Sequence, residues 1–546
     1  MSLSMVAKTR PAELSVGDPR RRPPIFRMTF LTMAAAAGLA AALPASALVA
    51  QDAVKISSGQ IHGAVVGQVA SFKGIPFAAP PVGDLRWRPP QPVQPWTGVR
   101  ETVAYGPGCI PFGGGGNQQS PAPSEDCLYL NIWKPANAAP GAKLPVMFWL
   151  FGGAFRTGSA SSPNFDGSNF AKQGVVLVTM NYRTGRLAQF AHPALTAEHP
   201  NEPMGNFGLQ DILAALKWVQ TNIEAFGGDT KNVTVFGQSS GAEYTHYLMA
   251  SPASRGLFAK AIAESGFGRH EALPVKGPGE TNGKLFAEAM GVAGTGPEAA
   301  KALRALSVAQ LTSQAAMTVP GAPIMRPMID GVVVVENYDQ AFAAGHELKI
   351  PYITGGNSWE ASLNADINKN PGPVLARAGT ARDQLVALYG GDPGDAAYDF
   401  TTDSNITEPA RNLLRLHAQH GQPTWGYYAS YQSPADRGVV HGLNHGGEIR
   451  YVFGNLNDKP EERGGRTIAA ATPEDWAMSK AMQAYWIAFA KTGNPGRAGG
   501  SLWAPYDPKA DNFMEFGSDG IKQKPQFHKA TLDLIEQINI AGSGVP

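Results

Sequence analysis

The chain has 546 residues, of which 43% are hydrophobic, and its 45 Lys and Arg nearly balance its 44 Asp and Glu. This composition supports a large buried core and argues against a disordered chain. The sequence has no basic stripe, which argues against nucleic acid as a partner. It has no polybasic cluster beyond the N-terminus, which argues against binding to a membrane surface.

The N-terminus has the pattern of an export signal. Four arginines between positions 20 and 27 precede an apolar stretch over 30–43, and Ala45-Ser46-Ala47 is a suitable cleavage motif. A membrane anchor is the alternative, but the apolar stretch is short for a helix that spans a bilayer. We therefore expect residues 1–50 to be a cleaved export signal region and the mature protein to be periplasmic or secreted, with no stable membrane insertion.

Cys109 and Cys127 are the two cysteines of the sequence. In an exported protein an even number of cysteines favours a disulfide, and two free buried thiols are the alternative. The sequence contains no zinc-type cysteine spacing and no His-Glu-x-x-His motif, so we expect no metal.

Strand and helix signals alternate along the mature chain. Continuous apolar runs over 146–151 and 175–180 predict buried parallel strands. Between 209 and 226 apolar residues recur at three- and four-residue steps, which predicts an amphipathic helix that Gly227-Gly228 ends. A short β run follows over 232–236. This alternation predicts a parallel sheet with helices on both faces, and the absence of a linker predicts one large domain.

Residues 237–241 read Gly-Gln-Ser-Ser-Gly, which matches the pattern Gly-x-Ser-x-Gly. In this pattern the serine lies on a sharp turn between a strand and a helix, and the residues two before and two after it are too crowded to carry side chains. A β run precedes the motif and helix-compatible residues 242–250 follow it, as the motif requires. A turn without a catalytic role is the alternative. We predict that Ser239 is a nucleophile at a helix N-terminus, which favours developing negative charge.

Attack of a serine on an ester creates a negatively charged oxygen that needs preorganised N–H donors. One donor is expected to be the amide of Ser240, directly after the nucleophile. The glycine-rich segment 151–155 follows the apolar run over 146–151, and we expect the amides of Gly153 and Ala154 to be the others. A turn without a role is the alternative for this segment.

The acid and the histidine of such a site are expected downstream of Ser239, in that order. Glu360 follows a strand-like run, at the end of a parallel strand where catalytic groups gather, with Asp330 and Asp366 as competitors. The pattern alone does not choose a histidine, although two of the candidates lie in a loop rich in Gly and Asn. The candidates are His346, His417, His420, His441, His445 and His528, of which His441 and His445 share that loop.

Long segments of the chain resemble the type-B carboxylesterases, a family that includes cholinesterase-like enzymes. These segments include FKGIPFAAPPVGDLRWRPPQP from Phe72, SEDCLYLNIW from Ser124, FGGDTKNVTVFGQSSGA from Phe226 and HGGEIRYVFGN from His445. The resemblance implies an α/β-hydrolase fold over 51–546, with a large, mostly parallel, twisted sheet flanked by helices on both faces. It also implies a serine carboxylesterase that hydrolyses small-molecule esters through an acyl-enzyme intermediate. We expect no cofactor.

The resemblance also selects the site residues. The family's catalytic histidine stands three positions before a Glu, which is His445 before Glu448, and its acid lies in an Asn-x-x-Glu loop that ends at Glu360. The implied catalytic residues are therefore Ser239, Glu360 and His445. Cys109 and Cys127 match the first disulfide of the family.

Several positions depart from the family pattern or add to it. A His or Tyr often begins the oxyanion segment, where this chain has Phe151, and the third glycine is Ala154, whose methyl group narrows the pocket. The residue before the nucleophile is often Glu, whereas Gln238 is neutral, which disfavours cationic choline esters and makes Gln238 a candidate substrate contact. Ser265 matches a family serine that supports the site by hydrogen bonding.

Arg156, just after the oxyanion segment, is a candidate contact for a substrate carboxylate, with an exposed surface arginine as the alternative. Some bacterial members of the family cleave polycarboxylate esters of mycotoxins, and we expect a related preference here. Other members lost catalysis and became binding proteins, but this chain keeps all three catalytic residues. An amidase or lactonase with the same residues is a further alternative. Segments 110–123, 269–280 and 361–374 are expected to shape the pocket.

Overall fold

The structure is a computed structural model that describes residues 49–50, 53–112, 121–313, 316, 325–364, 366–463 and 466–543. These residues belong to one compact unit, Ser46–Pro546. The predicted export signal lies outside the described residues, apart from Val49–Ala50 at its end. Within the described ranges, no helix is both long enough and apolar enough to cross a membrane.

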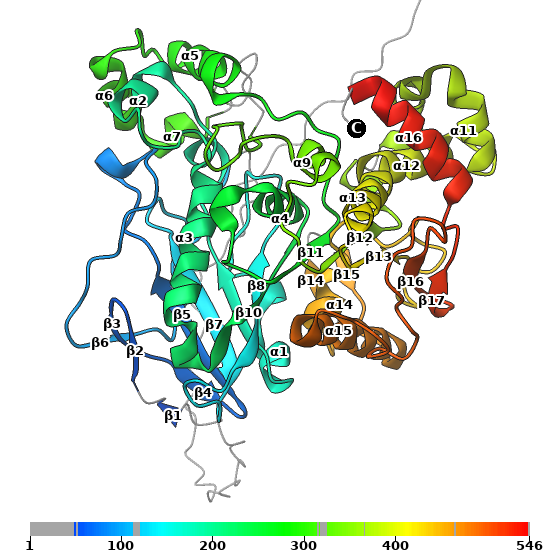
Figure 1. Ribbon diagram of the computed structural model, residues 1–546, viewed down its shortest axis with the longest axis horizontal. Helices are drawn as coiled ribbons and strands as arrows, with labels where there is room; N and C mark the ends of the chain where they lie inside the picture. The colour runs from blue at the N-terminus through cyan, green and yellow to red at the C-terminus, as the bar shows by residue number, and fades with distance from the viewer. Residues whose placement is uncertain are drawn as a thin grey trace, which may run out of the picture. The chain divides into compact units, whose positions relative to one another are not determined.

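A mixed sheet of twelve strands runs through the described part of the chain (Figure 1). Its central strands, from β9 to β16, are parallel to one another, and the strands beyond them on both sides are antiparallel. The predicted large α/β sheet is confirmed, and the antiparallel strands at its edges are an addition. In spatial order the strands are β1 (Val49–Ala50), β4 (Ala64–Val66), β5 (Val69–Pro76), β7 (Tyr129–Pro135), β9 (Val176–Met180), β8 (Leu144–Leu150), β10 (Gly228–Gln238), β11 (Lys260–Glu264), β12 (Tyr352–Asn357), β13 (Thr424–Ala429), β16 (Phe513–Gly517) and β17 (Gly520–Lys524).

Two smaller sheets accompany the main one, and helices connect its strands. The small sheets are β2 (Val54–Ile56) with β3 (Gly59–His62) and β6 (Val99–Glu101), and β14 (Glu461–Arg463) with β15 (Arg466–Ile468). The helices are α1 (Ser168–Lys172), α2 (Pro193–Glu198), α3 (Phe207–Asn222), α4 (Ser240–Ala250), α5 (Glu280–Ala289), α6 (Pro297–Ala305), α7 (Val308–Leu311), α9 (Tyr338–Ala344), α10 (Gly372–Leu375), α11 (Arg382–Leu388), α12 (Pro393–Thr402), α13 (Glu408–Gln419), α14 (Ile449–Phe453), α15 (Pro473–Thr492) and α16 (Lys529–Ser543).

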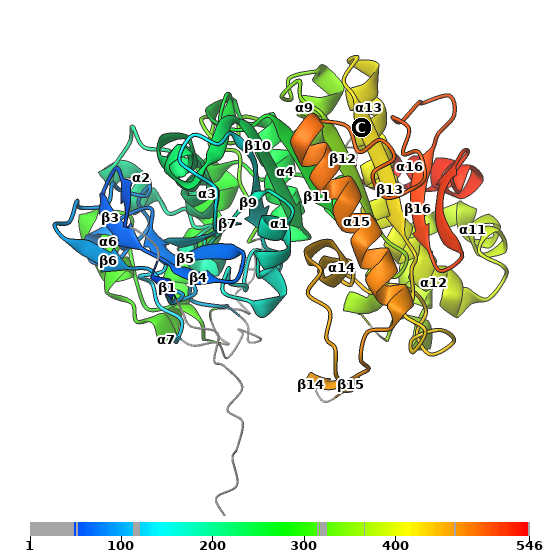
Figure 2. The same ribbon diagram turned by 90° about the horizontal axis from the view of Figure 1, so that it is seen from below.

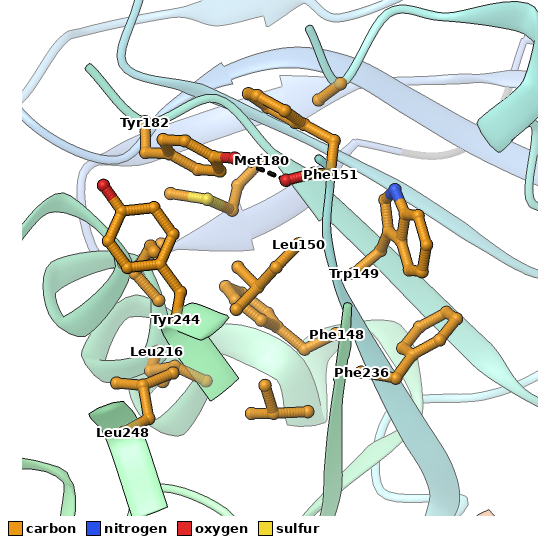
Figure 3. Packing of buried hydrophobic residues seen from close by; sticks show 14 of the residues in the cluster. Phe148, Trp149, Leu150, Phe151, Met180, Tyr182, Leu216, Phe236, Tyr244 and Leu248 are labelled. Carbon is orange, nitrogen blue, oxygen red and sulfur yellow. Dashed lines mark hydrogen bonds between the residues drawn. The ribbon is translucent and has the colours of Figure 1, made fainter. Parts of the chain in front are cut away.

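Helices cover both faces of the central strands. Figure 1 shows α4 and α13 above the strands and α15 below them, and Figure 2 shows α15 crossing in front of them. The surroundings of β8 explain why its sequence is apolar without interruption. Phe148 and Leu150 point toward the side of α3 and α4, whereas Trp149 points the other way with Phe236 (Figure 3). The Trp149 ring lies 4.9 Å from that of Phe453 in α14. Both faces of the strand are therefore buried.

The local predictions hold with small shifts at their boundaries. The apolar runs are β8 and β9, and the predicted amphipathic helix is α3 followed by one 3-10 turn, Ile223–Phe226. Gly227 ends this turn with φ 84°, a left-handed conformation that glycine adopts without strain. Strand β10 begins at Gly228, earlier than the run over 232–236 suggests.

Cys109 and Cys127 form the predicted disulfide, and both residues are buried. The bridge closes a loop between residues 18 positions apart. Because a bridge over a loop of this length lowers the conformational entropy of the unfolded chain, it stabilises the folded state by about 3 kcal/mol.

We expect the double variant Cys109→Ser/Cys127→Ser to lose about 3 kcal/mol of its free energy of unfolding in urea titrations. Dithiothreitol should destabilise the wild type similarly and leave the variant unchanged. An unaltered urea midpoint in the variant would contradict the prediction.

Candidate active site

Ser239 lies at the junction of β10 and α4, with φ 58° and ψ −125°. These angles lie outside the regions that non-glycine residues normally adopt, so the turn is strained. A Cβ atom on Gly237 would lie 2.5 Å from the carbonyl oxygen of Gly241, and one on Gly241 would lie 2.1 Å from that of Leu150. The steric reason for both glycines of the motif is therefore confirmed. The turn is held by the amide of Ser239, which donates to the carbonyl of Glu264 at 2.8 Å.

The segment after β8 passes directly beside Ser239. A Cβ atom on Gly152 would lie 2.8 Å from the Cβ of Ser239. The backbone then turns through three positive φ angles, 128° at Gly153, 55° at Ala154 and 60° at Phe155. The amides of Gly153 and Ala154 donate to no other described residue. Ser240 is the first residue of α4, so its amide has no acceptor within the helix.

Aromatic side chains hold this segment in place. The ring of Phe151 stacks on that of Tyr182 with centroids 4.2 Å apart, and the Tyr182 hydroxyl donates a hydrogen bond to the Phe151 carbonyl (Figure 3). Phe155 packs edge-on against Tyr244 of α4 at 4.9 Å. The free amides therefore belong to a segment that is anchored on both sides of Gly153.

Glu360 and His445 are brought together, although 85 positions separate them. His445 Nδ1 is hydrogen-bonded to Glu360 Oε2, and Glu360 Oε1 accepts a bond of 2.6 Å from the amide of Asn357. The amide of His445 donates to Ser362 Oγ at 2.9 Å. The carboxylate therefore fixes the ring orientation and the proton on Nδ1.

The competing acids and the neighbouring histidine lie elsewhere. Asp330 accepts hydrogen bonds from Asn206 and from the turn over 332–334. Asp366 is exposed and pairs with Lys369. His441 is bonded to Asp399 of α12 at 2.9 Å. None of the three contacts Glu360 or His445 by a hydrogen bond.

Gln238 makes a contact that sequence patterns do not reveal. Its Nε2 lies 3.2 Å from Nε2 of His445. A neutral imidazole with its proton on Nδ1 has its lone pair on Nε2, so the Gln238 amide donates to that lone pair. Gln238, a predicted substrate contact, thus lines the pocket and also bonds to the imidazole. Its position directly before Ser239 is the only sequence signal for this contact.

The electrostatics around His445 are dominated by carboxylates. Burial lowers the pKa of His445, but the charge and the hydrogen bond of Glu360 raise it more, and Glu448 and Glu243 add to the rise. The net result is a pKa above its ordinary value of 6.5. An imidazolium at this position is therefore stabilised.

Two further buried acids, Glu264 and Glu448, lie behind the site. Burial and the charge of Glu448 raise the pKa of Glu264, and burial and the charge of Glu360 raise the pKa of Glu448. We therefore expect the pair to hold a proton instead of two charges. Ser265 follows Glu264 with φ 54°, and its amide donates to Gly355. Its hydroxyl is buried, and the supporting hydrogen bond implied by the resemblance stays a prediction.

Ser239 and His445 line one pocket of about 550 Å³. Gly153, Ala154 and Arg156 also line this pocket. Of the three segments expected to shape it, 110–123 supplies Phe112 and 361–374 supplies Leu363, whereas the described part of 269–280 supplies no lining residue. The remaining apolar lining consists of Phe155, Phe267 and Met325. A concave, mostly apolar pocket of this size suits one small molecule. Within the described ranges, no three His, Cys, Asp or Glu side chains converge as metal ligands.

Comparisons with known proteins agree with this arrangement. The model of the carboxylesterase family matches residues 50–386 and 390–534. A fumonisin B1 esterase from Sphingopyxis macrogoltabida is 38% identical over 484 residues, which cover 84% of this chain and 85% of that protein. The para-nitrobenzyl esterase of Bacillus subtilis (strain 168) is 33% identical over 464 residues, covering 80% of this chain and 89% of that enzyme.

Solved structures give the same result. A crystal structure of a carboxylesterase from Geobacillus stearothermophilus has a TM-score of 0.75 and 31% identity, and the match covers 88% of this chain and 99% of that one. The fold, the disulfide and the similarity over most of the chain agree. The chain belongs to the carboxylesterase family and is a carboxylic ester hydrolase.

Proposed function

We propose that this enzyme hydrolyses esters through an acyl-enzyme, with Ser239 as nucleophile, His445 as general base and Glu360 as the acid that orients it. The hydrogen bond between His445 and Glu360, beside the pocket that Ser239 lines, is the observation that carries the proposal. The strained turn at Ser239 exposes its hydroxyl to that pocket.

The reaction begins when His445 Nε2 exchanges its bond with Gln238 for one with the Ser239 hydroxyl. The imidazole takes the proton as the serine oxygen attacks the ester carbonyl. The amides of Gly153, Ala154 and Ser240 donate to the developing oxyanion. The alcohol leaves with the proton from His445, and a water activated by the same imidazole then releases the acid.

Trapping the acyl-enzyme tests the mechanism directly. Acid quenching during turnover of p-nitrophenyl acetate should leave an acetyl group on the peptide that contains Ser239, seen by mass spectrometry. A burst of p-nitrophenol equal to the enzyme concentration should accompany it when deacylation is slower than acylation. Acetylation elsewhere, or turnover without any adduct at Ser239 under conditions that give a burst, would contradict the assignment.

A non-catalytic binding protein is the alternative function. Such a protein has no need of the strained serine, the oriented imidazole and the free amides that occur together here. Turnover of p-nitrophenyl acetate that Ser239→Ala abolishes removes this alternative.

We further propose that the substrates carry free carboxylates. The relative with 38% identity is named as an esterase of fumonisin B1. Arg156 lines the pocket, and its side chain forms no ion pair with another described residue. Arg156→Ala is expected to lower the preference for anionic over neutral esters roughly tenfold, because a charge-assisted hydrogen bond is lost. The ratio of kcat/KM values for a matched ester pair measures this. An unchanged ratio would refute the role of Arg156.

We propose a periplasmic or secreted location after cleavage near Ala45-Ser46-Ala47. The arginine-rich and apolar N-terminal sequence and the disulfide support it. N-terminal sequencing of the protein recovered from periplasm and medium tests both the cleavage and the location.

A further inference from the structure

A buried carboxylate lies one helical turn from Ser239. Glu243 belongs to the first turn of α4, and its amide donates to the Ser239 carbonyl at 2.9 Å. Residues four apart lie on the same face of a helix, and both residues line the same pocket. The Glu243 side chain is only 3% exposed. A carboxylate near a helix N-terminus is favourable by itself, but the proposed reaction brings a second negative charge to the same helix end.

These two negative charges oppose each other. The oxyanion is expected to accept a hydrogen bond from the amide of Ser240, the first residue of the helix that carries Glu243. Like charges repel more strongly in a mostly apolar pocket than in water. Glu243 also adds to the rise in the pKa of His445, after the larger effect of Glu360. An unpaired Glu243 would therefore oppose the oxyanion and favour a protonated imidazole, which is unable to accept the serine proton.

Arg326 supplies a positive charge next to Glu243. It lies in the segment before α9 and lines the same pocket, and its side chain is 34% exposed. Its Nε donates to Glu243 Oε2 at 3.1 Å. Burial raises the pKa of Glu243, and the charge and the hydrogen bond of Arg326 act against this rise. The two side chains therefore form an ion pair whose charges offset each other.

The other titratable groups that interact with this pair do not replace Arg326. Glu243 acts on Tyr244 and Tyr247 of α4 and on Tyr338 of α9, and burial raises the pKa of each tyrosine. Arg326 acts on His270, and burial together with nearby cations lowers the pKa of this histidine to about 3. None of these four groups carries a charge near neutral pH, so none of them offsets the charge of Glu243.

We propose that Arg326 is a positioning residue for ester hydrolysis, which pairs with Glu243 and thereby offsets the charge of Glu243 at the oxyanion and at His445. This inference rests on the proposed function and adds to it a residue that acts through Glu243 without touching the substrate. Removal of one charge of the pair unbalances the site, and removal of both charges restores part of the balance.

The pH dependence of kcat/KM for p-nitrophenyl acetate, a neutral ester, tests the proposal. In Glu243→Gln, His445 loses a neighbouring negative charge while Arg326 keeps its positive charge. The acidic limb of the profile should therefore move to lower pH by at least about 0.5 unit. Addition of Arg326→Gln to this variant should move the limb back to higher pH by at least about 0.3 unit.

This return of the limb separates an electrostatic role from a merely structural one, because a second disruption of the packing would not reverse the first. An unmoved limb in Glu243→Gln, or no return after removal of Arg326, would overturn the proposal. Glu224→Gln is the matched control. Glu224 pairs with Lys143 on the surface and precedes β10, whose other end leads to Ser239, so this variant should keep the wild-type profile.

The pairing itself is tested by the stability of Arg326→Gln. Without Arg326, the pKa of the buried Glu243 carboxyl rises further above its value in the unfolded chain. A raised pKa in the folded state gives stability that is lost as the pH increases. The urea midpoint of Arg326→Gln should therefore fall increasingly below that of Glu243→Gln/Arg326→Gln between about pH 5 and about pH 8. Equal midpoints over this range would overturn the pairing.

Failure of this inference is distinguishable from failure of the proposed function. An acetyl group on Ser239 in the wild type, together with acidic limbs that stay in place in the variants, would keep the serine mechanism and remove the role of Arg326. Limbs that move as expected, without any adduct at Ser239, would keep the coupling of Arg326 to His445 and remove the nucleophile.

Discussion

Glu360→Gln is expected to lower kcat by about four orders of magnitude without unfolding the protein. The amide of Asn357 donates to Glu360 Oε1, so the oxygen of a glutamine is expected to take that place. Its NH₂ group then faces His445 Nδ1 and favours the ring form with the lone pair on Nδ1 and the proton on Nε2. That imidazole is unable to accept a proton from Ser239.

The pH profile provides a second readout. The base must be neutral, and its pKa is raised by Glu360, so kcat/KM of the wild type should fall as the pH decreases through a value above 6.5. Without the carboxylate this acidic limb should move to lower pH. Asp366→Asn, the competing acid that pairs with Lys369 on the surface, should alter neither rate nor profile. Ser239→Ala sets the background rate. A Glu360→Gln rate within tenfold of wild type would remove the assignment.

Gly241→Ala is expected to prevent accumulation of folded enzyme. Gly241 is a residue of α4, where alanine is favoured over glycine by about 1 kcal/mol on helix propensity alone. Against this, the new Cβ would lie 2.1 Å from the carbonyl oxygen of Leu150, which is backbone of β8 and has no side-chain freedom. Relieving this clash requires α4 to move away from β8. We therefore expect the variant to lose more than about 4 kcal/mol of its free energy of unfolding.

Gly296→Ala is the matched control, because nothing lies within 4 Å of a Cβ at that position. Soluble yield and thermal unfolding should be near wild type for Gly296→Ala and strongly reduced for Gly241→Ala. Wild-type stability of Gly241→Ala would mean that the helix shifts freely, and the steric account of the motif would be wrong.

Local sequence patterns were sufficient for β8, β9, α3 and the turn at Ser239, because burial on both faces, helical periodicity and steric crowding act over a few residues. They missed the start of β10, since Gly228, Asp229 and Lys231 are polar or flexible although backbone pairing with β8 begins at Gly228. The antiparallel edges of the sheet also have no local signature.

The candidate site divides in the same way. Ser239 carries its own motif. The strand-like run before Glu360 only favoured it over Asp330, and the family resemblance was needed to select Glu360 and His445. Their contact joins segments 85 positions apart, which tertiary packing alone decides. The hydrogen bond from Gln238 to His445 has no sequence signal beyond the place of Gln238 directly before Ser239, because tertiary packing alone brings the two side chains together.

The loops that carry Glu360 and His445 are hydrogen-bonded to each other. The amide of Trp359 donates to the Leu443 carbonyl at 3.0 Å, and the Asn357 side chain donates to the Asn444 carbonyl at 2.9 Å. Glu360 and His445 therefore form one hydrogen-bonded unit, and Arg156 contributes none of the bonds between their two loops. Directed evolution can accordingly change the specificity of the pocket by substitutions in the segment of Arg156 while this unit is kept.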